Sequence, residues 1–208
     1  MRSTTIRFLL FGVQALVANS WAQQRPPIVE RMAKAYGLDS WNQVEAIRYT
    51  WNVQLGTMNI AHAWEWEPKT GRVTYEGKDK DGKPVKVTYL RAELSGQPDA
   101  VKNEIDPAFI NHNYTFLFPL KAYWDASATV IDQGRYNLPV GGGTADLIAV
   151  KYPAEGGGYT PGDTWELYVG KDGRVEDLMH HRGGSKKLSL FFVTWAAHKK
   201  AGPPARFN

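Results

Sequence analysis

The chain contains no cysteine among its 208 residues. This absence excludes disulfide bonds, thiolate metal ligands, cysteine nucleophiles and a lipid anchor on cysteine. Apolar runs are short as well, and none reaches the roughly 18–20 residues that a membrane-spanning helix needs. The chain also has little excess charge of either sign: it contains 25 Lys and Arg and 21 Asp and Glu, and the two signs alternate along the sequence. A nucleic-acid partner would need a concentrated basic face, so we expect none.

Hydrophobic and aromatic residues are abundant by contrast. They make up 43% and 12% of the chain, and eight residues are tryptophan. This composition is too hydrophobic for a disordered chain, and the length suits a single domain.

The N-terminal segment, residues 1–22, has the features of a secretory signal peptide. Two arginines precede an apolar stretch over residues 8–18, and small residues occupy the cleavage-site positions at Ser20 and Ala22. We therefore expect cleavage near Ala22 and export to a bacterial periplasm, with residues 23–208 forming a single mature domain. No cysteine follows the cleavage site, so we do not expect the mature protein to be a lipoprotein. An N-terminal core helix is the alternative interpretation.

Apolar and polar residues alternate from residue 47 onward, which is the period of a half-buried strand. The clearest run covers residues 47–55, and three further runs follow it after short turns. These four segments predict an antiparallel meander with one aromatic face. After a gap, strands are predicted over residues 129–133, 145–152, 164–169, 174–181 and 188–195.

The gap holds the helical part of the chain. Residues 98–125 are rich in apolar residues, and Asp106 and Pro107 are typical of a helix start, with the aspartate as N-cap. Residues 28–36 predict a further helix, and residues 199–208 predict a loose tail. The expected fold is therefore mainly β, with one curved antiparallel sheet of about nine strands that forms a half-open β-barrel. The helical insertion would lie across the concave face as a lid.

Four short motifs carry a resemblance to known proteins. They are YGLDSWN at 36–42, WEWEPKTGR at 64–72, FLFPL at 116–120 and YTPGDTWELYV at 159–169. With these motifs the sequence resembles a family of exported bacterial proteins related in fold to the lipoprotein carriers and to outer-membrane lipoprotein-sorting proteins. The resemblance implies helices across the apolar hollow of a half-open sheet. In the lipoprotein carriers that hollow holds acyl chains.

Bulky aromatic residues are the candidate binding residues. An apolar sheet face must be covered by a helix, close on itself or bind an apolar molecule. We expect a hydrophobic-ligand cavity lined by nine residues: Trp51, Trp64, Trp66, Tyr89, Phe116, Phe118, Trp124, Trp165 and Trp195. The alternative is that the same residues form a filled core.

Polar candidates are fewer. Arg48 is expected on the polar face of its strand, or, if a bulge shifts the register, as a latch that bonds carbonyl groups of the lid. His62 and His180 are a conceivable ligand pair, although a hydrogen-bonded strand histidine is the simpler interpretation. No H-x-x-x-H spacing and no nucleophile elbow occur. We therefore predict no metal, no cofactor and no catalytic residue.

The sequence favours a monomeric periplasmic binding module for a lipid, an acyl chain or another hydrophobic molecule, without catalysis. A peripheral contact with an envelope membrane is left open. The first alternative is an envelope structural or interaction protein with a filled aromatic core. The second is an enzyme acting on a lipid or glycan, which would need a carboxylate or histidine pair inside the hollow.

Overall fold

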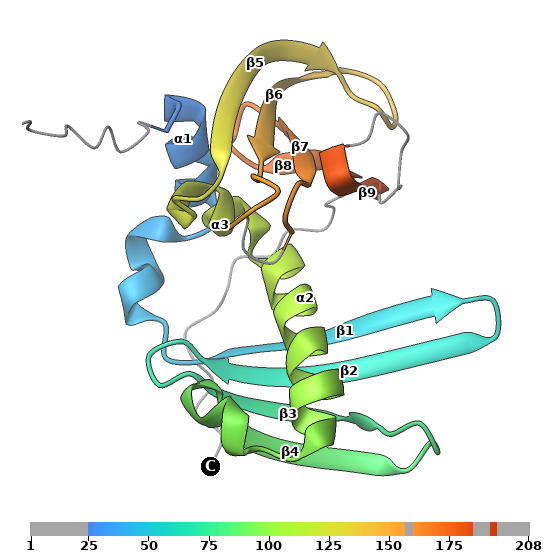
Figure 1. Ribbon diagram of the computed structural model, residues 1–208. Helices are drawn as coiled ribbons and strands as arrows, with labels where there is room; N and C mark the ends of the chain where they lie inside the picture. The colour runs from blue at the N-terminus through green and yellow to red at the C-terminus, as the bar shows by residue number, and fades with distance from the viewer. Residues whose placement is uncertain (1–24, 157–159, 185–191, 195–208) are drawn as a thin grey trace, which may run out of the picture.

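The computed structural model describes residues 25–156, 160–184 and 192–194 (Figure 1). The expected signal peptide (1–22), Trp195 and the expected tail (199–208) lie outside the described residues. No helix in the described part of the chain is long and apolar enough to cross a membrane.

The strands form two antiparallel sheets. The first sheet has the order β1 (Ile47–Leu55), β2 (Met58–Glu67), β3 (Arg72–Lys78) and β4 (Pro84–Leu90). The second has the order β5 (Thr129–Asn137), β6 (Thr144–Lys151), β7 (Thr164–Val169), β8 (Val175–His181) and β9 (Phe192–Thr194). In both sheets each strand pairs with its neighbour in sequence, as expected of hairpins joined by short turns.

The mainly β class is confirmed, but the prediction of one continuous half-open barrel is wrong. Strands β4 and β5 are separated by a long helical connection, and they belong to different sheets. Strict alternation identifies strands but does not say which strands pair, so the helical gap after residue 90 could not be recognised as the boundary between two sheets.

The helices join the two sheets. The connection from β4 to β5 contains η2 (Arg91–Gly96), the π-helix η3 (Val101–Ile105), α2 (Asp106–Phe116) and α3 (Phe118–Trp124). Figure 1 shows α2 crossing the first sheet, while α1 (Pro27–Ala35) and α3 lie beside the second. Two short 3-10 helices, η1 (Leu38–Gln43) and η4 (Arg182–Gly184), complete the described elements. The predicted insertion is helical, but only part of it covers the first sheet: α2, η3 and η2 contribute residues to that core, whereas α3 packs with the second sheet.

Each sheet has its own core, and α2 contributes to both. Phe109, near the start of α2, is buried against Trp64 and Tyr89 of the first sheet. Tyr114, near its end, is buried with residues of α1, α3 and the second sheet. A third cluster around Leu117 and Leu120 packs between the two cores. The molecule is thus two sheets connected through one shared helix.

The start of α2 is fixed by a buried carboxylate. Asp106 is 5% exposed and accepts hydrogen bonds from the Tyr89 hydroxyl (2.9 Å) and the Arg91 Nε (3.0 Å). The predicted N-cap role is wrong, because helical backbone already precedes Asp106 in η3 and its side chain caps no N–H of α2. The carboxylate instead ties α2 to the end of β4.

Candidate functional site

The expected cavity residues are divided between different parts of the molecule. Trp64 (2% exposed) and Tyr89 (3%) are buried in the first core, whereas Phe118 (0%) and Trp165 (6%) are buried in the second. These four residues belong to two separate clusters of buried residues. The structure places these four residues in packed cores.

The other candidates are more open. Trp51 is half-buried, and Phe116 is 45% exposed with its ring stacked 5.1 Å from that of Tyr49. Trp66 and Trp124 are half-buried beside Trp41, with ring centroids 6.2 and 4.8 Å from it. Trp41 was not among the predicted binding residues, because it lies in η1, outside the alternating strands.

A hollow of about 1090 Å³ opens where the two hairpins of the first sheet diverge. Strands β1 and β2 pair as far as Leu55 and Met58, but β2 and β3 pair only as far as Ala63 and Glu76. Beyond that point the hairpins separate and extend past α2 (Figure 1). We call this space the hairpin hollow; it is lined by Asn52, Val53, Gln54, Asn59, Ile60, Ala61, His62, Gly77, Lys78, Asp79, Lys80, Gly82 and Glu104.

Glycine at position 77 shapes the β3 side of the hairpin hollow. The Tyr75 ring lies over this glycine, and a Cβ there would come within 2.1 Å of the tyrosine oxygen. A residue with a side chain would therefore displace the Tyr75 ring, which packs edge-on against His62 at 5.4 Å.

Two histidines lie where α2 meets the hairpin hollow. The ring of His112, from α2, stacks on Trp51 at 4.6 Å, and its Nδ1 accepts a hydrogen bond from the Trp64 Nε1 (3.2 Å). The His62 ring centroid lies 5.3 Å from that of His112. Because Nδ1 of His112 is an acceptor, its proton is assigned to Nε2.

Burial keeps both histidines uncharged near neutral pH. Desolvation lowers the pKa of His62, and desolvation together with the neighbouring His62 lowers the pKa of His112 to about 4. His112 is 8% exposed, so little water remains to solvate an imidazolium. The sequence analysis missed His112, although it lies one helical turn after Phe109 and thus on the face that α2 turns to the sheet.

We predict that acid weakens the fold through His112. The unfolded chain binds this proton near pH 6.5 and the folded chain near pH 4, so stability is full above pH 6.5 and falls as the pH drops towards 4. The expected loss through this group is about 3 kcal/mol. Urea unfolding at pH 7 and pH 4 measures it, with His112→Asn as the control because its amide oxygen can still accept from Trp64. An equal loss in both proteins would contradict the assignment.

The sequence analysis considered His62 together with His180, but these residues belong to different sheets. The Nε2 of His180 lies 2.6 Å from Asp163 Oδ2, and the His180 ring stacks on Trp165 at 3.9 Å. The other oxygen of Asp163 accepts the Gly183 N–H at 2.8 Å. This pair ties β7 and β8 to η4. Within the described ranges no three His, Asp or Glu side chains come together as a metal site.

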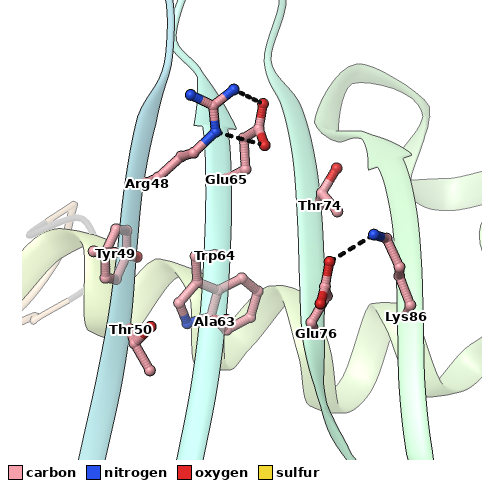
Figure 2. Close-up of a pocket in the computed structure, with 9 residues that line it drawn as sticks. All are labelled: Arg48, Tyr49, Thr50, Ala63, Trp64, Glu65, Thr74, Glu76 and Lys86. Atoms are coloured by element: carbon pink, nitrogen blue, oxygen red, sulfur yellow. Dashed lines mark hydrogen bonds and ion pairs between the residues drawn. The ribbon is translucent and has the colours of Figure 1, made fainter. Parts of the chain in front are cut away.

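Arg48 lies on the outer face of the first sheet. It donates from Nε and one terminal nitrogen to the two Glu65 oxygens at 2.9 and 2.8 Å (Figure 2). The pairing of β1 with β2 runs without a register shift, so the bulge that the latch interpretation required does not occur in this pair. The ion pair raises the pKa of Arg48 and lowers that of Glu65.

A shallow hollow of about 350 Å³ surrounds this ion pair, and Figure 2 draws the residues that line it. Its rim carries a second pair, between Lys86 and Glu76 at 2.6 Å, and Thr74 bonds Thr88 beside it at 2.9 Å. Charges of both signs are already matched across neighbouring strands here. The arrangement is that of a polar outer sheet face.

Comparison with known proteins adds one structural similarity. The chain is similar to the crystal structure of the lipoprotein LppX of Mycobacterium tuberculosis, with 12% sequence identity, coverage of 77% of this chain and 90% of LppX, and a TM-score of 0.32. No protein-family model matches the sequence, and no curated protein matches it.

Proposed function

We propose that this protein is an exported periplasmic binding module that holds a lipid, an acyl chain or another hydrophobic molecule without catalysis. The observation that carries the proposal is the hairpin hollow. Its volume of about 1090 Å³ is close to the upper end of the range of small-molecule binding sites, about 300–1,000 Å³. The residues Val53 and Ile60 form a cross-strand pair on the inner sheet face, and both are half-buried. An apolar chain could cover this part of the sheet.

The packing of the aromatic residues supports a ligand position beyond α2. Trp64 and Tyr89 are covered by α2, so a ligand reaches the inner face only beyond the helix. Burial of an alkyl chain contributes about 0.8 kcal/mol per methylene, so about ten methylenes suffice for micromolar binding. Binding would then rest on burial of the chain.

We predict that Ile60→Asp lowers the affinity for a fluorescent fatty acid by tenfold or more, because the chain would have to desolvate a carboxylate. Ile60 is half-buried at the hairpin, so the fold should persist. Native mass spectrometry and organic extraction of mature protein, purified from periplasm without detergent, measure any co-purified lipid. Ile131→Asp is the matched control, since Ile131 is 38% exposed on β5 of the second sheet. Equal lipid content in all three proteins would contradict the proposal.

A second candidate is an envelope structural or interaction protein. The burial of four large aromatic residues favours this candidate, because such side chains are buried in the same way in an ordinary filled core: Trp64, Tyr89, Phe118 and Trp165. A clean mass without ligand, together with no uptake of the fluorescent fatty acid, would favour this candidate over the first.

A further inference from the structure

His62 brings an unpaired polar group to the inner face of the first sheet. It forms a cross-strand pair with Trp51, at the edge of the area that α2 covers. The next pair outward on the same face is Val53 and Ile60. His62 thus stands between the helix-covered aromatic core and the open apolar end of the sheet.

The two ring nitrogens of His62 differ in their surroundings. Nδ1 is buried and has no hydrogen-bond partner among the described residues. Because His62 also lines the hairpin hollow, Nε2 is the nitrogen left to face that space. Nε2 is therefore the ring nitrogen that can exchange a hydrogen bond with water or with a ligand in the hairpin hollow.

The other polar groups of the hairpin hollow come from the outer sheet face, from the turn after β3 or from the helical connection. Alternation places Asn52, Gln54, Asn59 and Lys78 on the outer face, and Lys80 lies in the turn between β3 and β4. The Oδ1 of Asp79 is occupied by the N–H groups of Asp81 and Lys83, each at 2.9 Å. Glu104, from η3, approaches the hollow from the helical side. Within the apolar inner wall itself, His62 supplies the hydrogen-bonding group.

We propose that the ligand is an amphipathic molecule with a hydrogen-bonding head, such as a long-chain alcohol or acid, and that Nε2 of His62 bonds this head. The apolar chain then runs outward along Val53 and Ile60. This inference rests on the proposed function and specifies its ligand class. It gives His62 the selecting role: a chain with a hydroxyl or carboxyl head binds better than one of equal length without it.

The test compares 1-decanol with 1-chlorodecane, which share a chain length and differ in the hydrogen-bonding head. Displacement of a fluorescent fatty acid gives a Kd for each compound with wild type and with His62→Phe, which keeps the aromatic ring. The two compounds transfer from water with different free energies, but this difference cancels when the ratio of their Kd values is compared between wild type and His62→Phe. We expect the preference for the alcohol to fall by about three- to tenfold in His62→Phe, the worth of one hydrogen bond.

Two further variants sharpen this comparison. Val53→Ser should weaken the binding of both compounds by the same factor, because it changes the wall beside the alkyl chain and not the group that bonds the head. Glu104→Gln should leave the preference unchanged; if it removes the preference instead, the head is bound by Glu104 and the proposal for His62 is overturned.

The outcomes separate the two proposals. If neither compound displaces the probe from wild type, the proposed function and this inference both fail. If both compounds bind and His62→Phe retains the full preference, only the inference fails. NMR of the wild-type histidine rings gives an answer that needs no variant: saturation with 1-decanol, but not with 1-chlorodecane, should shift the nitrogen signals of His62. No difference between the two compounds would overturn the inference.

Discussion

Replacing Phe118 with alanine is expected to lower the free energy of unfolding by about 4 kcal/mol. The side chain is fully buried at the start of α3, and its ring packs against Trp165 at 4.7 Å and Tyr114 at 5.4 Å. Tyr114 comes from the shared helix and Trp165 from the second sheet, so the cavity would open where these elements meet. Urea unfolding at pH 7 measures the change.

Phe116 is the matched control, because it is the same residue type two positions earlier. It is 45% exposed and stacks on Tyr49 of the first sheet. Its replacement by alanine should lower the free energy of unfolding by about 1 kcal/mol or less, the worth of one exposed aromatic pair. Similar losses for both phenylalanines would show that Phe118 is not at the centre of a core.

Asp106→Ala is expected to lower the free energy of unfolding by about 3 kcal/mol. The substitution leaves the buried Tyr89 hydroxyl without its acceptor and removes the ion pair between Arg91 and Asp106. Circular dichroism during urea unfolding measures the loss. Burial and the neighbouring carboxylate raise the pKa of Tyr89, so its hydroxyl stays protonated and needs the acceptor across the working pH range.

Glu65→Ala serves as the comparison for Asp106. Its carboxylate also pairs with an arginine, Arg48, but on the exposed outer face. Surface ion pairs contribute little to stability, so this variant should unfold close to wild type. A loss as large as that of Asp106→Ala would mean that exposure does not distinguish the two pairs.

Local structure was well predicted from the sequence, because its signals are local. Strict alternation predicted residues 47–55 as a strand, and β1 covers Ile47–Leu55. The run over 164–169 likewise coincides with β7. The boundary at Pro107 is less sharp, because α2 continues a π-helical turn that begins at Val101. No residue pattern marks a hydrogen-bonding change of that kind.

The arrangement of the site could not be predicted in the same way. Periodicity assigns Trp64 and Val53 to one sheet face. It does not show that α2 covers Trp64 and that Val53 lies beyond the helix, at the hairpin end. The distance between His62 and His112 depends on where the helix crosses the strands, which is a tertiary property. The aromatic candidates were therefore chosen by size, whereas the structure distinguishes them by how far each side chain is buried.

The shared helix also limits where this chain could be joined to a second protein of similar fold. One surface of α2 is fitted to the strands that precede it in the chain and another to the strands that follow it. A chimera joined within residues 98–125 would match α2 to one parent and mismatch it to the other. A working chimera should therefore keep α2 together with its packing partners in both sheets.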